Sequence, residues 1–381
     1  MHEGKRNYFF GLDLVRFAAA LMVSLFHIGF TSWSRPESFG NRFWQHSYQF
    51  PDLASWTWSG WVGVQIFFVI SGLVIANSAE GATPGQFAAS RFLRLYPAAW
   101  ICVSATWIVA SLVNFPPSAK VLIVSYALVP TGPFIDGQYW TLGVEIVFYA
   151  CVWLMLRLFS FSKINWLAAG LVAGGLISVA VEANSPRLGH MLEFGKGRIL
   201  PFHYAHYFAL GIVLRQWSVG RLTPWLAAIG AVALTLSIAS VFSSAAPYAF
   251  YGTIHFSRLV PVAIFVAALG MLILSLRYSR AFYRLPDRAL STFRAMGLAT
   301  YPLYLLHFTI GVTMLRKLVQ SGVEPHAALA LTISGLVMLS LLVAQYAERW
   351  VRRLVIRLAR ESGLGKWRRK ELKLAEEASL P

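Results

Sequence analysis

Three ionisable residues lie within the first long apolar stretch of the chain, where charge is costly. Asp13, Arg16 and His27 interrupt the stretch that starts at residue 9. An ionisable group inside a membrane helix costs about 2.5–3.5 kcal/mol on insertion scales, so each one requires a partner or a function. The spacing of Arg16 and His27 is close to three helical turns, which places them on one helix face, about 16 Å apart. A cation near one membrane surface and an imidazole near the other suit a passage that admits an anionic substrate at one end and reacts at the other.

Each of these residues also has a purely structural interpretation. Asp13 and Arg16 are spaced so that they can pair with each other near the membrane interface. A histidine in a membrane helix often serves only to hydrogen-bond a neighbouring helix. Because intramembrane ionisable groups are functional by default, we favour a function for His27 and regard pairing and function as equally supported for Asp13.

A carboxylate in the fourth apolar stretch is harder to explain by packing. A helix that begins at Tyr139 would carry Glu145 about 9 Å below the membrane surface. The short side chain of Glu145 cannot reach water from there, so it requires a proton or a partner. The inferred depth is close to that of His27, which predicts that the carboxylate orients the imidazole as a base. A structural ion pair is the alternative.

A polar stripe runs along the ninth apolar stretch. Thr300, Tyr304, His307 and Gly311 recur with helical spacing, which predicts one narrow polar or small face toward the same interior. Helix packing through small and hydroxyl groups explains the stripe equally well.

Two further pairs of residues are less specific signals of function. Ser71 and Gly72 in the second stretch are more typical of a close helix contact than of a nucleophile. Arg91 and Arg94 lie in an expected cytoplasmic loop, where one helical turn would present two guanidinium groups that suit the phosphates of a nucleotide-like donor. Retention of basic residues on the cytoplasmic side explains this second pair at least as well.

The rest of the chain must form the helices that hold these residues across a bilayer. Of its 381 residues, 57% are hydrophobic and 13% are charged, which excludes a soluble enzyme and a disordered chain. Apolar stretches of about 20 residues recur, and each is long enough to cross about 30 Å of hydrocarbon. The sequence predicts an all-α polytopic membrane bundle of about ten helices, at 9–31, 61–79, 98–114, 139–158, 165–182, 200–217, 224–243, 259–276, 297–318 and 327–347.

Basic residues predict the orientation of these spans, because cytoplasmic loops retain Lys and Arg. If both termini and every second loop lie inside, those segments hold more than twice as many of the 33 Lys and Arg residues as the outside segments. We therefore expect both termini to be cytoplasmic, with a transmembrane domain at 1–347 and a basic tail at 348–381 on anionic lipid. This distribution accounts for the net charge of +17 without a nucleic-acid partner.

No metal site is expected. Cys102 and Cys151 both fall inside apolar stretches, where a lone cysteine behaves as a small hydrophobe. The sequence contains no His/Cys cluster with the spacing of a zinc site.

Five stretches together resemble the acyltransferase-3 family of multi-span bacterial acyltransferases that modify cell-surface glycans and related acceptors. In chain order they are GLDLVRFAAALMVSLFH, GVQIFFVISG, SRFLRLYPAAW, QYWTLGVEIVFY and TYPLYLLHF. Their order and their spread over most of the chain make the joint signal stronger than any single stretch.

The resemblance implies ten core spans and an acyl-CoA donor that enters from the cytoplasm. It implies that Arg16 and His27 are essential, that Arg91 and Arg94 bind the CoA phosphates, and that Glu145 lies at the outer reaction chamber. The residues assigned to the lining of the pore or acceptor site are Ser71, Trp140, Tyr304 and His307.

Two positions depart from the family pattern. Gln65 stands where many relatives have Asp, so no acid role is assigned to it. After the last span the family often has Glu followed closely by Pro, whereas Glu348 is followed here by Arg, Trp and Val.

The residues and the resemblance together suggest O-acyl transfer, with acetyl as the expected group, from cytoplasmic acyl-CoA to a hydroxyl of an extracytoplasmic or lipid-linked glycan. His27 would act as general base or carry the acyl group transiently. Arg16 would steer the donor or stabilise negative charge, and Asp13 and Glu145 would complete the catalytic set. Acyl-CoA is then a co-substrate, no bound cofactor is expected, and the expected location is a bacterial cytoplasmic (inner) membrane.

Two other classes of function fit a polytopic bundle with polar groups inside. A transporter or flippase for a glycan or lipid-linked intermediate would carry inverted repeats or paired Gly/Pro-broken spans, which the sequence does not clearly show. A scaffold for surface-polymer assembly would tolerate the loss of His27. The sequence leaves open the acceptor, the acyl chain and the oligomeric state, a homo-oligomer included.

Overall fold

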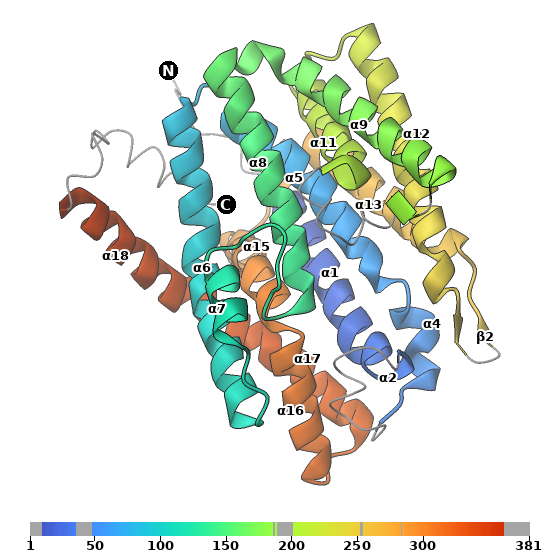
Figure 1. Ribbon diagram of the computed structural model, residues 1–381, viewed down its shortest axis with the longest axis vertical. Helices are drawn as coiled ribbons and strands as arrows, with labels where there is room; N and C mark the ends of the chain where they lie inside the picture. The colour runs from blue at the N-terminus through green and yellow to red at the C-terminus, as the bar shows by residue number, and fades with distance from the viewer. Residues whose placement is uncertain are drawn as a thin grey trace.

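The chain folds into a bundle of helices, most of which run along the long axis of the molecule (Figure 1). The computed structural model describes residues 10–35, 48–185, 187–188, 201–251, 254–282 and 284–361. Within those ranges the only strands are β1 (Phe250–Tyr251) and β2 (Ile254–His255), which form a short antiparallel pair. The predicted all-α fold class is confirmed, and the chain is a multi-pass membrane protein.

Eight helical segments in the described part of the chain are long and apolar enough to cross a membrane, and each coincides with an expected span. A continuous apolar stretch produces them because every backbone polar group in lipid must bond within its own helix. Their main helices are α1 (Phe10–Phe26), α5 (Gly63–Ala79), α6 (Pro84–Leu112), α8 (Trp140–Leu158), α9 (Ile164–Asn184), α12 (Pro224–Ser244), α13 (Leu259–Arg277) and α17 (Pro325–Leu342).

The other two expected spans are not single long helices. The ninth consists of α15 (Asp287–Leu306) and α16 (Thr309–Gln320), which meet at an angle of 78°. The sixth is α11 (Ala205–Ser218), a helix of 14 residues that follows a 3₁₀ turn. At 1.5 Å per residue, α11 alone is too short to cross about 30 Å of hydrocarbon. By length the described part therefore has eight spans, or nine with the bent pair, instead of ten.

The short helix α11 lies inside the bundle, against α5, α9 and α12. Its close contact with α5 depends on two glycines. A Cβ atom on Gly72 would lie 2.2 Å from the carbonyl oxygen of Phe208, and one on Gly211 would lie 2.1 Å from that of Val69. Gly72 is therefore a packing residue, as its sequence context favoured.

Helix α6 begins 14 residues earlier than the expected third span. Thr83 and Gln86 form a capping box at its N-terminus, with the Gln86 N–H donating to Thr83 at 3.2 Å and the Thr83 N–H donating to Gln86 at 2.9 Å. The prediction that Arg91 and Arg94 lie in a loop is therefore wrong: both are on the second and third turns of a continuous helix. The expectation failed because Thr-Pro-Gly, an apparent loop signal, starts this helix.

Shorter helices connect these elements, and a basic helix follows the last span. The connecting helices are α2 (Ser32–Ser34), α4 (Ala54–Thr57), α7 (Ala119–Tyr126) and α14 (Ser279–Phe282). After α17, a π-helical turn at Val343–Ala347 leads into α18 (Glu348–Glu361), which leaves the bundle at an angle beside α6 (Figure 1). The rest of the expected tail, 362–381, lies outside the described residues.

The break between α15 and α16 overturns the prediction of one polar stripe from Thr300 to Gly311. Gly311 lies beyond the 78° bend, and a Cβ atom there would meet Ile28 at 2.6 Å and Leu336 at 3.0 Å. Gly311 is therefore a packing residue. Regular spacing predicted the stripe only on the assumption that the helix stayed continuous.

The segment 136–138, just before α8, supplies hydrogen-bond partners to both sides of this break. Asp136 accepts a hydrogen bond from the Thr309 backbone N–H at 3.4 Å and another from the Thr309 hydroxyl, at the start of α16. The Gln138 amide donates to the Leu305 carbonyl at 3.4 Å, at the end of α15. A broken helix in a membrane requires such partners, because lipid offers none.

We expect Asp136→Ala to destabilise the fold by about 1–3 kcal/mol, because the buried donors of Thr309 lose their acceptor. Asp136→Asn keeps one acceptor oxygen and is expected to lose less. The measurement is the thermal unfolding midpoint of the purified protein in lipid nanodiscs. Ser291→Ala, which removes an exposed hydroxyl bonded only to its own helix at 2.8 Å, serves as control. Equal midpoints for Asp136→Ala and Ser291→Ala would contradict the role of Asp136.

Candidate functional site

Two cavities of different character adjoin each other inside the bundle. The smaller has a volume of about 130 Å³, and we call it the arginine cavity because Arg16, Arg91 and Arg94 line it. The larger has a volume of about 700 Å³, and we call it the histidine cavity because His27 lines it. Arg16 on α1 and His27, at the start of the π-helical turn His27–Thr31 that follows α1, therefore line different cavities.

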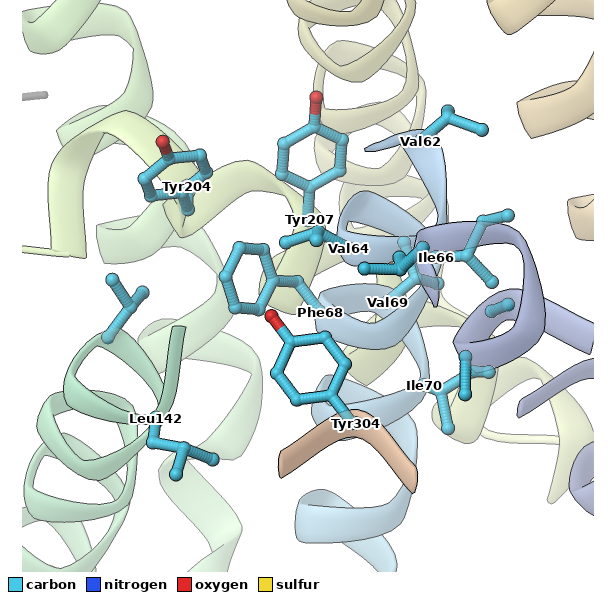
Figure 2. Close-up of a cluster of buried hydrophobic side chains, with 14 of the residues drawn as sticks. Val62, Val64, Ile66, Phe68, Val69, Ile70, Leu142, Tyr204, Tyr207 and Tyr304 are labelled. Atoms are coloured by element: carbon cyan, nitrogen blue, oxygen red, sulfur yellow. The ribbon is translucent and has the colours of Figure 1, made fainter. Parts of the chain in front are cut away.

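The two cavities meet at Val64 of α5 and Tyr304 of α15, which line both. We call these two residues the neck. Figure 2 shows both within a cluster of buried side chains, with the Phe68 ring beside them. The ring of Phe67 packs edge to face against Tyr304, with centroids 5.6 Å apart. The single passage that the sequence suggested is thus divided by a neck of packed side chains.

Three guanidinium groups from two helices face the arginine cavity. Arg16 comes from α1, and Arg91 and Arg94 come from neighbouring turns of α6. Arg91 donates through Nε to the Ser90 hydroxyl at 3.2 Å, and Arg94 lies over the Tyr301 ring, 5.9 Å from its centroid. Nη1 of Arg94 is buried without a hydrogen-bond partner among the described residues. The structure thus brings Arg16 together with the pair Arg91 and Arg94, which lies far from it in the sequence.

Glu145 is the carboxylate that lines the arginine cavity. Its Oε1 accepts hydrogen bonds from the Ser71 hydroxyl and from the Tyr149 hydroxyl, the latter at 2.6 Å. The expected contact between Glu145 and His27 is not made, so the predicted pair of carboxylate and imidazole is wrong. Depth along two helices predicted it, but depth does not determine which way each helix faces.

With one carboxylate against three guanidinium groups, the walls of the arginine cavity carry net positive charge, which favours an anionic ligand. Glu145 attracts the Arg16 guanidinium, and Arg94 repels it. The Ser71 hydroxyl lines the same cavity and donates its hydrogen to Glu145, which holds this carboxylate in place.

Asp13 lies behind Arg16 and lines neither cavity. Its side chain is buried, 3% exposed, and attracts the Arg16 guanidinium electrostatically. Gly297 of α15 makes room for it, because a Cβ atom there would lie 2.3 Å from the carboxyl carbon of Asp13. This arrangement agrees with the pairing interpretation of Asp13 and Arg16.

The histidine cavity combines an imidazole with aromatic and polar side chains. Trp140 and Tyr204 pack against each other at its wall, with the ring planes tilted by 37° and the ring centroids 5.0 Å apart. The residues that supply its hydrogen-bonding groups include Gln138, Ser178, Glu182, His203, His206, Ser240 and Ser243. An apolar wall with convergent polar groups is typical of a binding site for a small polar molecule. Trp140 and Tyr304, which the sequence analysis assigned to the pore or acceptor site, line this cavity.

His307, which was assigned to the lining of the pore or acceptor site, contacts His27 and lines neither of these two cavities. Its side chain is fully buried, 0% exposed. Nε2 of His307 lies 2.9 Å from Nδ1 of His27, and Nδ1 of His307 lies 2.8 Å from the carbonyl oxygen of Tyr304. His307 reaches the histidine cavity only through His27.

His206 is a site residue that the sequence analysis missed. It lines the histidine cavity from α11, is 2% exposed, and neither ring nitrogen has a hydrogen-bond partner among the described residues. Buried polar atoms of this kind need an explanation, and a bound ligand supplies one. The signal was in the sequence, since His206 interrupts an apolar stretch as His27 does.

Tyr149 and Asp136 were missed as well. Tyr149 lines the arginine cavity and donates to Glu145, and it lies one helical turn from that residue. Asp136 supports the helix break without lining either cavity. The described residues contain no group of three or more His, Cys, Asp or Glu side chains that could hold a metal ion.

Comparison with known proteins identifies the family of the chain. The family model of the acyltransferase-3 domain, described as an acyltransferase domain, matches residues 9–349. No curated protein and no solved structure matches the chain. The matched range includes both cavities and the neck. Because the match covers nearly the whole chain, this membrane protein belongs to the acyltransferase-3 family.

Proposed function

We propose that the protein transfers an acyl group, with acetyl as the expected one, from cytoplasmic acyl-CoA to a hydroxyl of an extracytoplasmic or lipid-linked glycan. The observation that carries this proposal is the pair of adjoining cavities, one lined by three guanidinium groups and the other by an imidazole, with Val64 and Tyr304 between them. We place the enzyme in the bacterial cytoplasmic membrane, where donor and acceptor lie on opposite sides.

The arginine cavity supports the donor part of the proposal. Coenzyme A carries phosphate groups, and guanidinium groups bind phosphates through paired hydrogen bonds. Arg91 and Arg94 are one turn apart on α6, and the buried Nη1 of Arg94 has no hydrogen-bond partner among the described residues. Arg16 stands deeper on α1 and steers the donor arm toward the neck. Since Arg16 and His27 line different cavities, steering fits Arg16 better than charge stabilisation at the reacting carbon.

The histidine cavity supports the acceptor part. Its volume of about 700 Å³ leaves room for sugar rings, and ligand sites usually measure roughly 300–1,000 Å³. Trp140 and Tyr204 offer flat apolar faces, and His206 offers two ring nitrogens with no partner among the described residues. A sugar has both kinds of surface, with C–H faces that pack on aromatic rings and hydroxyls that hydrogen-bond.

The chemistry follows from the imidazole of His27, which lines this cavity. His27 accepts the proton of the acceptor hydroxyl, and the hydroxyl oxygen attacks the thioester carbonyl carbon. The new C–O ester bond forms, and the C–S bond of the thioester breaks. The imidazolium of His27 then returns the proton to the departing thiolate, which leaves as the CoA thiol. The thioester is already activated, so the reaction requires no metal.

We expect His27→Gln to lower the rate of acyl transfer about 10²- to 10⁴-fold, the usual contribution of a general base. The measurement is radiolabel transfer from acetyl-CoA to the glycan fraction of membranes that contain the protein. His326→Gln serves as a matched control, because that histidine is exposed and bonds Asp52 and Glu324, each at 2.9 Å. Glycan export without incorporation of label would support the transporter alternative and overturn the proposal.

Arg91→Gln and Arg94→Gln should each raise the Kd for acyl-CoA roughly 10- to 100-fold, since a hydrogen bond to a charged group contributes about 1.5–3 kcal/mol. Lysine at either position keeps the charge but not the paired hydrogen bonds, so an intermediate loss is expected. The measurement is isothermal titration of the protein in nanodiscs with CoA. Arg157→Gln, at the exposed end of α8, is the control. If Arg91→Gln and Arg157→Gln bind CoA equally well, the arginine cavity is not the donor site.

A further inference from the structure

The geometry points to His307 as a positioning residue that fixes the tautomer of His27, through a chain of hydrogen bonds from the Tyr304 carbonyl to His307 and from His307 to His27. The consequence is that Nε2 of His27 carries a free lone pair. The catalytic meaning of this inference rests on the proposed function, whereas the tautomer itself does not.

His307 is a neutral imidazole whose hydrogen lies on Nδ1. A backbone carbonyl oxygen can only accept, so Nδ1 of His307, 2.8 Å from the Tyr304 oxygen, must carry a hydrogen. His307 is fully buried, and its ring nitrogens contact a carbonyl and another imidazole, with no carboxylate bonded to either among the described residues. A buried imidazolium without a counter-charge is too costly in such surroundings. The ring is therefore neutral, and its Nε2 is an acceptor.

His27 carries its one ring hydrogen on Nδ1, which leaves Nε2 as an acceptor. Nε2 of His307 accepts, and it lies 2.9 Å from Nδ1 of His27, so that Nδ1 must donate. A neutral imidazole has one hydrogen, and with it on Nδ1 the other nitrogen, Nε2, is an acceptor. His27 is partly exposed and lines the histidine cavity, so this lone pair is available to a hydroxyl there. The arrangement presents His27 as a base before any substrate binds.

The end of α15 holds this chain of hydrogen bonds in place. The last carbonyl groups of a helix lack intrahelical partners, and the break after Leu306 leaves the Tyr304 carbonyl in that last turn. Asp136 and Gln138 hold the two sides of the break. Neighbouring rings restrict His27, with the Phe26 centroid at 5.2 Å and the His307 centroid at 5.0 Å.

His307 thus takes the place that the sequence analysis gave to a carboxylate. When His27 accepts a proton at Nε2, it becomes an imidazolium whose Nδ1 hydrogen is already bonded to His307. A neutral acceptor orients the ring without adding a negative charge, so the imidazolium remains a good acid for the departing thiolate. Without His307, the hydrogen of His27 loses its acceptor and can move to Nε2, and an Nε2 that carries a hydrogen cannot accept the proton of a hydroxyl in the histidine cavity.

The test uses two variants of the full-length protein in lipid nanodiscs. His307→Gln keeps an acceptor oxygen for His27 and an N–H group for the Tyr304 carbonyl. His307→Leu has similar bulk but neither group. The first readout is ¹⁵N NMR of histidine-labelled protein, with the His27 signals assigned from His27→Gln. We expect Nδ1 of His27 to carry the hydrogen in the wild type and in His307→Gln, and the hydrogen to shift wholly or partly to Nε2 in His307→Leu.

The second readout separates positioning from a packing role. We expect His307→Leu to lower kcat for transfer from acetyl-CoA about 100-fold, the low end of what general-base catalysis contributes, with KM for acetyl-CoA unchanged. His307→Gln should recover kcat to within about tenfold of the wild type. A packing role predicts the reverse order, because leucine suits a buried apolar position better than glutamine.

The tautomer of His27 and the proposed acyl transfer are tested by different outcomes. A wild-type His27 with its hydrogen on Nε2 overturns the inference, whatever the activity. Wild-type kcat in His307→Leu overturns it as well. The expected tautomer in a protein that transfers no label from acetyl-CoA supports the inference and defeats the proposed function. If His307→Leu does not fold, the wild-type and His307→Gln spectra still decide.

Discussion

A helix that breaks inside a membrane leaves backbone groups that lipid cannot satisfy, and each such group costs several kcal/mol unless the protein supplies a partner. The break between α15 and α16 is the place in this structure where that constraint acts most directly. Thr309 is bonded by Asp136, Leu305 by Gln138, and the Tyr304 carbonyl by His307. The last of these partners connects the break to His27, so the requirement for hydrogen bonds in lipid also orients the proposed base.

A second consequence of the packing is the separation of the three guanidinium groups from the imidazole. The three guanidinium groups and Glu145 lie on one side of Val64 and Tyr304, and His27 lies on the other. Full charges so close to His27 would dominate its protonation in surroundings where water does not screen them. The division allows one cavity to attract an anion while the other holds a neutral base. Tyr304 takes part in both, through its side chain at the neck and its carbonyl behind His307.

The fold was largely predictable from the sequence, because length and apolar composition determine where a helix can cross a membrane. Nine of the ten expected spans match long helices or the bent pair, and only the short α11 does not. The position of the bend was not predictable: Pro302 signals a kink, but the break comes later, at 307–308, and its hydrogen-bond partners come from the distant segment 136–138. The early start of α6 was hidden by residues that serve equally well in loops and at helix N-termini.

The sequence indicated individual residues of the candidate site, but it did not indicate which of them contact each other. The cost of polar groups in lipid correctly drew attention to Arg16, His27 and Glu145, which all line cavities. The same rule applied to α11 would have found His206. Which residue faces which depends on helix rotation and on the bend, and one sequence contains neither. For that reason Glu145 was assigned to His27, whose actual partner is His307.

The most direct test of the central claim is a structure of the protein with a non-hydrolysable acetyl-CoA analogue in lipid nanodiscs. If donor and acceptor meet at the neck, the phosphates of the analogue will contact Arg91 or Arg94, and its carbonyl carbon will lie past Tyr304 beside Nε2 of His27. An analogue bound with its acetyl group away from His27, or bound outside the arginine cavity, would contradict the account.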